Sequence, residues 1–243
     1  MRILAFSDLH RDEQAGRSLV ERSPQVDVVA GVRDFASMHH GLRRMIDVLS
    51  AIDRPALLVP GNNETDDALR AACAGWPAAR VLHGEVAEID DVTFFGLGGG
   101  VPVTPWEWSF DLTEQHAERM LTGLPPGAVR LVHSPPSGHV DGGLGSAAVL
   151  RAIHQRRPRL VLCGHVHDCW GQESRVGDVP VRNLGPGGAV IELDAGASSA
   201  PHARLPRAST GDLPSPPSES PGLHPTSVRD FPIAASASWR HGA

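Results

Sequence analysis

Five short apolar segments of the chain are each followed at once by side chains that can bind a metal ion. The donors are aspartate, asparagine or histidine in every case. A single donor has an ordinary explanation, such as a turn residue or a surface histidine. Their repetition after five successive segments predicts one shared site. The segments and the residues that follow them are RILAF before SDLH, VDVVAGV before RDF, ALLVP before GNNE, VRLV before HSPP, and RLVLC before GHVH.

The mixture of donors indicates which metals this site would bind. Imidazole nitrogens with carboxylate and carboxamide oxygens suit Mn, Fe, Zn, Co or Ni ions. The set exceeds the four ligands of one tetrahedral zinc, so a pair of ions fits it better. Two ions about 3.5 to 4 Å apart, bridged by a carboxylate, acidify a water molecule and stabilise both oxygens of an in-line displacement. The pattern therefore predicts hydrolysis of a phosphoester by a metal-activated hydroxide.

The elements that must position these donors follow from the apolar pattern. The five segments are continuous rather than alternating, which is typical of strands buried on both faces of an α/β sheet. Helical patterns occupy residues 40–52, 65–76 and 146–157, and residues 85–101 and 178–193 each look like a hairpin. Loops converge at the carboxyl ends of strands in open α/β sheets. We therefore expect a layered α/β domain with the donors at one edge.

Length and composition narrow the class of protein. The chain has 243 residues, a formal net charge of −6 and no run of Lys or Arg, which disfavours a nucleic-acid scaffold or a membrane surface as partner. It has no apolar stretch of about 18 residues and no signal-peptide pattern, so we expect a cytoplasmic protein. We predict a domain over residues 1–195. Residues 196–243 are rich in Pro, Ser and Ala, and we predict a disordered tail there.

The cysteines argue against a disulfide framework. There are three, Cys73, Cys163 and Cys169, and none forms a CxxC pair. We expect each to be a small buried thiol rather than a metal ligand.

In their order and spacing, the motifs resemble those of the calcineurin-like metallophosphoesterases, over about residues 1 to 193. That family is recognised by Asp-x-His, Gly-Asp-x-x-Asp, Gly-Asn-His-Asp/Glu, a lone His and Gly-His-x-His. Longer agreement in HSPPSGHVDGG, GHVHDCWGQ and NLGPGG is similar to a small single-domain bacterial branch of the family. The matching positions are Asp8-Leu9-His10, Arg33-Asp34-Phe35-Ala36-Ser37, Gly61-Asn62-Asn63-Glu64, His133 and Gly164-His165-Val166-His167.

The resemblance implies a four-layer α-β-β-α sandwich with two mixed β-sheets and a site for two divalent metal ions. Manganese is the metal we expect to support activity in vitro. The implied substrate is a small phosphoester or nucleotide, with a phosphodiester favoured over a monoester. The implied ligands are Asp8, His10, Asp34 and His167 for one ion, and Asp34, Asn62, His133 and His165 for the other, with Asp34 bridging.

Three positions depart from the family pattern. Asn63 stands where most relatives have a histidine that contacts phosphate and acts as an acid, and acid catalysis is worth about 10² to 10⁴-fold. His139 is our candidate replacement, although it could instead face solvent or orient Asp141. Arg33 replaces the usual glycine and either reaches a phosphate or points outward. Ser37 replaces an aspartate that is not a direct ligand in most members.

These departures leave a second function open, a degenerate relative that binds metal or nucleotide with little turnover. A protein phosphatase is less favoured, because the chain is short for substrate-docking insertions. The stretch GLGGGVPVTPWEW (96–108) matches no phosphate-binding loop. Trp106 or Trp108 could stack on a base there, or could pack under a surface loop. The sequence predicts no oligomeric state.

Overall fold

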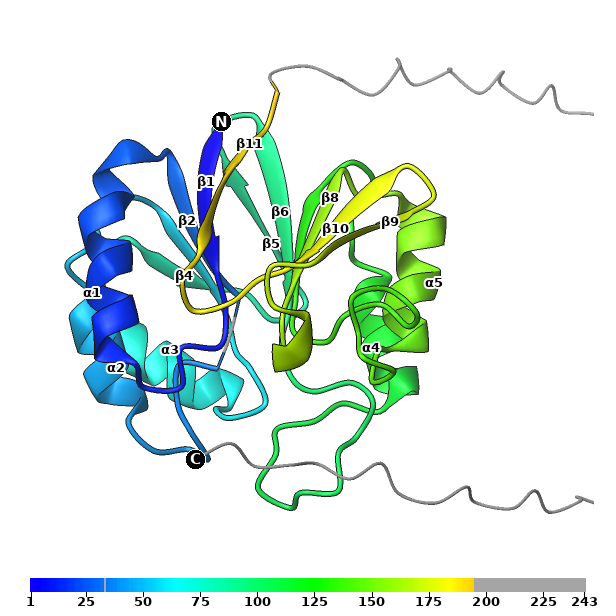
Figure 1. Ribbon diagram of the computed structural model, residues 1–243, viewed down its shortest axis with the longest axis horizontal. Coiled ribbons are helices and arrows are strands. Elements are labelled where there is room, and N and C mark those ends of the chain that lie inside the picture. The colour runs from blue at the N-terminus through cyan, green and yellow to red at the C-terminus, as the bar shows by residue number, and fades with distance from the viewer. Residues whose placement is uncertain (33, 195–243) are drawn as a thin grey trace, which may run out of the picture. The chain divides into compact units, whose positions relative to one another are not determined.

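The computed structural model describes residues 1–32 and 34–194, which form two β-sheets with helices on their outer faces (Figure 1). The first sheet contains, in spatial order, β11 (Ala189–Glu192), β1 (Arg2–Phe6), β2 (Val28–Val32), β3 (Ala56–Val59) and β4 (Ala79–Val81). The second contains β5 (Glu85–Ile89), β6 (Val92–Leu97), β7 (Val129–Val132), β8 (Leu160–Cys163), β10 (Val179–Asn183) and β9 (Glu173–Val176).

Each sheet has a parallel centre and antiparallel margins. Strands β1 to β4 run parallel, while β11 pairs antiparallel with β1. Strands β6, β7, β8 and β10 also run parallel, and β5 and β9 are the antiparallel edges of that sheet. Both sheets are therefore mixed.

The helices lie in two outer layers. The layer over the first sheet contains α1 (Glu13–Arg22), α2 (Leu42–Leu49) and α3 (Asp66–Cys73), and the layer over the second contains α4 (Glu114–Leu121) and α5 (Ala147–Arg156). Short 3₁₀ turns lie at Ser23–Gln25 and His167–Cys169. The predicted four-layer α-β-β-α sandwich is confirmed.

Three apolar layers hold these elements together, because successive side chains of a strand point to opposite faces. In β1, Leu4 and Phe6 pack under the helices of the first sheet, whereas Ile3 and Ala5 join the layer between the sheets. The same central layer contains Val129 and other residues of the second sheet. The central strands are buried on both faces, as their continuous apolar pattern predicted.

The helix starts show where the sequence pattern was right and where it was not. Thr65 accepts a hydrogen bond from the Ala68 N–H and caps α3, and Ser146 caps α5 in the same way. The pattern over residues 40–52 overestimated α2, because Gly41 has a left-handed backbone (φ 79°) and the helix begins after it. Helix α1 was not predicted.

Of the two predicted hairpins, one is confirmed and one is wrong. Strands β5 and β6 pair antiparallel around Asp90 and Asp91. Residues 178–193 do not form a hairpin, because β10 stays in the second sheet and β11 crosses to the first. The crossing segment is held to the end of β1 by a hydrogen bond from Ser7 N–H to Gly185 O.

Strand β11 also returns the chain to its start. The Met1 amino group donates to Leu193 O at 3.0 Å, and the Leu193 N–H donates to Met1 O at 2.8 Å. All three cysteines are free and buried, as predicted. Within residues 1–32 and 34–194, no helix has the length and apolar character needed to cross a membrane.

Candidate metal centre

The donors predicted from sequence all lie just beyond the carboxyl ends of parallel strands. Asp8 and His10 follow β1, Asp34 follows β2 and Asn62 follows β3 in the first sheet. In the second sheet, His133 comes directly after β7, and the Gly164–His167 segment follows β8. The ends of both sheets contribute to the same site, because residues from each are found in both of the clusters described next.

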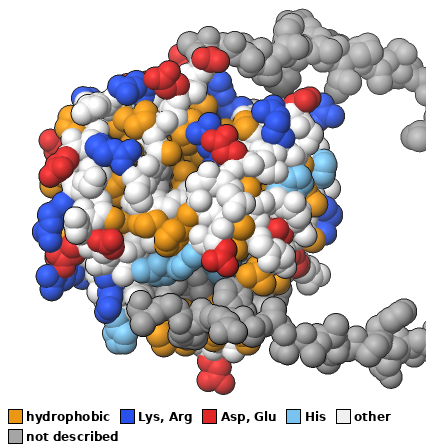
Figure 2. Space-filling view, viewed as in Figure 1, with side chains coloured by type: hydrophobic (Ala, Val, Ile, Leu, Met, Phe, Trp, Pro, Cys, Tyr) orange, Lys and Arg blue, Asp and Glu red, His pale blue; other side chains and the backbone are white. Residues whose placement is uncertain are grey.

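The first cluster consists of Asp8, His10 and His167. One ligand atom of each lies within 4.8 Å of the other two, and the Nε2 atoms of the two histidines are 3.1 Å apart. Asp8 is buried, whereas His10 is half-buried and His167 is exposed. Figure 2 shows histidine side chains at several places on the viewed face. Partial desolvation lowers the pKa of His167, which favours the neutral imidazole that a metal ion requires.

The second cluster consists of Asp34, His133 and His165, again with ligand atoms within 4.8 Å of one another. Asp34 and His133 are buried. The rings of His133 and His165 meet at an angle of 61° with centroids 4.4 Å apart. Asn62 adjoins this cluster, because its Oδ1 atom lies 2.9 Å from His133 Nε2.

Asp34 lies between the two clusters. Its Oδ2 atom is 3.8 Å from His10 Nε2 and 3.9 Å from His133 Nε2. Imidazole nitrogens, carboxylate oxygens and a carboxamide oxygen thus lie close together. Such a donor set fits borderline divalent cations, and the position of Asp34 fits a shared ligand.

Hydrogen bonds fix Asp8 in its position. Its Oδ2 atom accepts from Ser7 Oγ at 2.5 Å and from Trp170 Nε1 at 3.2 Å, and its carboxylate also accepts from His165 N–H. The Trp170 ring also packs against His167 at 4.4 Å between centroids. Sequence reasoning gave no role to Ser7 or Trp170, and their only signal was closeness in sequence to Asp8 and His167.

Glu64 joins the loops that follow β2 and β3. Its Oε1 accepts from Gly61 N–H at 2.7 Å and its Oε2 from Ala36 N–H at 3.0 Å. Burial raises the pKa of Glu64 to about 8, and the charge of Asp34 adds to this rise. The sequence placed Glu64 in a motif without a function, and the structure shows that it holds both loops.

Asn63 is buried and fully engaged in local hydrogen bonds. Its Oδ1 accepts from Met38 N–H at 2.8 Å, and its own N–H donates to Asp34 Oδ1 at 3.1 Å. Its Nδ2 points to Asn62 Oδ1 at 3.4 Å. This residue therefore orients the backbone around Asp34 in the place where a family histidine was expected.

The other catalytic candidates have different outcomes. His139 Nδ1 meets Ser174 Oγ on the edge strand β9 at 2.8 Å, and its assignment as an acid stays a prediction. Arg33 and residues 195–243 lie outside the described residues, so the role of Arg33 and the predicted tail also stay predictions. Asn183 is buried, and its Nδ2 donates to Gly164 O and Val140 O, so it braces the loop of the second sheet.

The tryptophan loop borders Asn62. The rings of Trp106 and Trp108 are stacked, with centroids 5.6 Å apart and planes within 11°. Further along this loop, Ser109 Oγ accepts from Asn62 Nδ2 at 2.8 Å, and Phe110 N–H donates to Asn62 O. The loop thus supports a predicted ligand, a contact that its sequence did not reveal.

Comparisons with known proteins agree with this fold. Two solved structures show it: TT1561 of Thermus thermophilus has a TM-score of 0.62 at 23% identity, covering 76% of this chain and 90% of that one. A dimetal phosphatase from Danio rerio has a TM-score of 0.55 at 13% identity, covering 76% of this chain and 88% of that one.

The sequence comparisons address the family. A UPF0046 protein from Caenorhabditis elegans is 31% identical over 103 residues, which cover 37% of this chain. The match spans only 24% of the length of that relative. Residues 1–200 match the calcineurin-like phosphoesterase superfamily domain, and the chain therefore belongs to this superfamily.

Proposed function

We propose that the protein is a metal-dependent phosphoesterase that hydrolyses a phosphodiester in preference to a monoester. The observation that carries the proposal is the position of Asp34 between two clusters of ligand-type side chains. Membership of a phosphoesterase family supports the reaction class. The diester preference rests on the likeness of the motifs to diesterases within that family.

The seven side chains divide into two sets of four that share Asp34. Two bound divalent ions would supply an acidified water molecule and positive charge for the phosphoryl oxygens. One set would be Asp8, His10, Asp34 and His167, and the other Asp34, Asn62, His133 and His165.

The surrounding residues keep these ligands in position. Trp170 and Ser7 orient Asp8, while the Asn63 N–H and the loop held by Glu64 orient Asp34. Ser109 orients the Asn62 carboxamide through its Nδ2, which leaves Oδ1 directed at His133. Preorganised ligands of this kind do not need to rearrange when an ion binds.

The proposal is tested on the purified full-length protein. Its metal content is measured, and hydrolysis of bis(p-nitrophenyl) phosphate and p-nitrophenyl phosphate is compared with added Mn²⁺. We expect about two ions per chain, faster turnover of the diester, and loss of both ion binding and turnover in Asp34→Asn. Turnover that persists in Asp34→Asn would count against the proposed site.

Asn63 favours the second candidate function, a family member that binds metal with little turnover. A chain that binds two ions but hydrolyses neither ester would support this alternative.

The Asn63→His variant tests whether the protein lacks a general acid or has one at another position. A histidine at this position should speed hydrolysis of esters with poor alkyl leaving groups by about 10²-fold or more. Nitrophenyl esters should change little, because their leaving groups need no proton. The ratio of kcat/KM for the two kinds of ester is the measurement. No gain would indicate that another residue, such as His139, already supplies the proton.

A further inference from the structure

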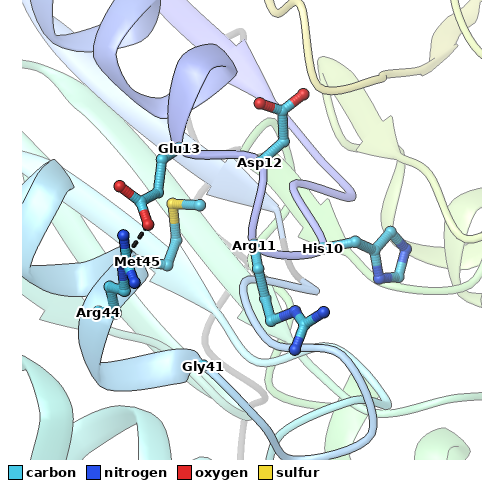
Figure 3. A pocket seen from close by; sticks show the side chains of 7 residues that line it. All are labelled: His10, Arg11, Asp12, Glu13, Gly41, Arg44 and Met45. Atoms are coloured by element: carbon cyan, nitrogen blue, oxygen red, sulfur yellow. Dashed lines mark ion pairs between the residues drawn. The ribbon is translucent and has the colours of Figure 1, made fainter.

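A hollow of about 480 Å³ adjoins the first cluster on the side of α1 and α2 (Figure 3). His10 and Arg11 line it at the loop that follows β1, and Glu13, Arg44 and Met45 line it from the two helices. A volume of this size accommodates part of a small ligand. The hollow therefore extends from a proposed metal ligand toward a region that the proposed reaction does not use.

Both acidic side chains that line the hollow have partners within the protein. Glu13 forms ion pairs with Arg17, at 2.9 Å, and with Arg44. Asp12 Oδ1 caps α1 by accepting from the N–H groups of Gln14 and Ala15. The charge of Glu13 is therefore balanced by arginines, and one oxygen of Asp12 is occupied by the helix N-terminus.

Arg11 is the lining cation whose charge is not matched in this way. Within the described part of the chain, no carboxylate or carbonyl oxygen pairs with its guanidinium group. Arg44, by contrast, has Glu13 as its partner. A guanidinium group offers paired N–H donors that suit a phosphate or carboxylate group.

The Arg11 side chain is also held in place. Its N–H donates to Phe35 O at 3.2 Å, and the neighbouring His10 N–H donates to Asp34 O at 2.8 Å, so the backbone is tied to the loop that contains Asp34. Its Cγ and Cδ atoms pack on Gly41, where a Cβ atom would overlap them. Less side-chain freedom remains to be lost when the guanidinium binds a ligand.

We infer that Arg11 binds a second anionic group of the substrate, outside the phosphoryl group that is hydrolysed. The substrate class is then a phosphoester whose alcohol part carries another phosphate or a similar anion. This inference rests on the proposed function, since the phosphoryl group under attack would lie at the metal clusters. The hollow supplies the space for the rest of the molecule, and Arg11 lines it next to His10.

The test uses two substrates that differ only in the second anion. They are the p-nitrophenyl ester of thymidine 5′-phosphate and the same ester with an added 3′-phosphate, assayed with Mn²⁺ and full-length protein. We expect the 3′-phosphate to raise kcat/KM by about 10- to 100-fold, the range of a charge-assisted hydrogen-bonded pair. Arg11→Ala should abolish this preference, and Arg11→Lys should keep part of it.

Arg43→Ala is the matched control, because Arg43 lies on α2 outside this hollow and pairs with Asp47. It removes the same charge from the same region and should leave the preference unchanged. Equal losses on both esters in Arg11→Ala would overturn the inference, since Arg11 would then act on the group that the esters share. A wild-type protein without any preference would overturn it as well.

Ligand-binding measurements distinguish a failure of the proposed function from a failure of the inference about Arg11. If neither ester is hydrolysed, the affinities of thymidine 3′,5′-bisphosphate and thymidine 5′-phosphate are compared by calorimetry. Tighter binding of the bisphosphate that Arg11→Ala removes would support the inference in a protein that lacks turnover. Equal affinities, or a difference that survives Arg11→Ala, would refute it.

Discussion

At the scale of single residues, four of the seven proposed ligands have left-handed backbone conformations. The φ angles are 56° at Asp8, 44° at His10, 46° at Asp34 and 69° at His165. Each such conformation costs a non-glycine residue about 1 to 3 kcal/mol. These strained residues all lie in the loops that bring the proposed ligands together. The conformational strain therefore lowers stability at the site where the ligand geometry requires it.

The position of Asp8 also requires that the backbone at Gly164 lie close to its carboxylate. A Cβ atom at Gly164 would overlap Asp8 Oδ2 and approach Ser7 Oγ. We therefore expect Gly164→Ala to displace Asp8 and to lower metal occupancy and kcat/KM by at least about 10-fold, because ligand geometry is disturbed. Gly187→Ala is the control, since a Cβ atom there meets nothing within 4 Å. Metal content and steady-state kinetics are measured for both variants. An equal loss in Gly164→Ala and Gly187→Ala would refute the steric argument.

The ligands could be predicted from sequence because each one follows a recognisable apolar segment. The residues that hold them could not. Trp170 reaches Asp8 across 162 positions of sequence, and Ser109 reaches Asn62 across 47. Such contacts depend on how loops from different strands meet, which no local pattern records.

At the scale of elements, Glu64 is the link between the loops after β2 and β3. Both of its carboxylate oxygens accept buried backbone N–H groups, from Gly61 and Ala36. These loops contain Asp34 and Asn62, so one side chain fixes the relative position of two adjacent strand ends.

Removing this link should be costly. Glu64→Ala leaves two buried N–H donors without an acceptor, and each costs about 1 to 3 kcal/mol, so we expect the free energy of unfolding to fall by about 2 to 6 kcal/mol. Urea denaturation measures the change. The control is Glu88→Ala, on the exposed face of β5, which should change the free energy of unfolding by less than about 0.5 kcal/mol. A Glu64→Ala variant as stable as wild type would show that the loops are held by other contacts.

The error over residues 178–193 belongs to this scale too. Two strand-like runs joined by Leu184-Gly185-Pro186-Gly187-Gly188 have the pattern of a hairpin, but β9 already occupies the antiparallel position beside β10. The β11 run instead pairs with β1. Local pattern identifies a strand, whereas the choice of partner depends on which sheet edge remains open.

At the scale of the whole described domain, each cluster draws on both sheets. The first takes Asp8 and His10 from the first sheet and His167 from the second, and the other combines Asp34 with His133 and His165. A bound ion would therefore add a link between two sheets that pack through a central apolar layer and share hydrogen bonds at Asp8.

Metal binding should consequently stabilise the folded protein. At Mn²⁺ concentrations about 100 times the Kd, one site adds about 2.7 kcal/mol, which raises Tm by about 5 to 10 °C for a domain of this size. Thermal unfolding with Mn²⁺ and with EDTA measures the shift. Asp34→Asn should lose most of it, because that carboxylate is the proposed shared ligand of both ions. The same shift in Asp34→Asn would place the stabilising ion elsewhere.

The pairing of β11 with β1 brings residue 193 within hydrogen-bonding distance of residue 1. A short linker could therefore close the domain into a ring, and the exposed turn at Asp90 and Asp91 offers a place to open it again. In such a circular permutant the ribosome would make the histidines of the second sheet before the aspartates of the first. The order of synthesis would be reversed, while the contacts that assemble the centre stayed the same.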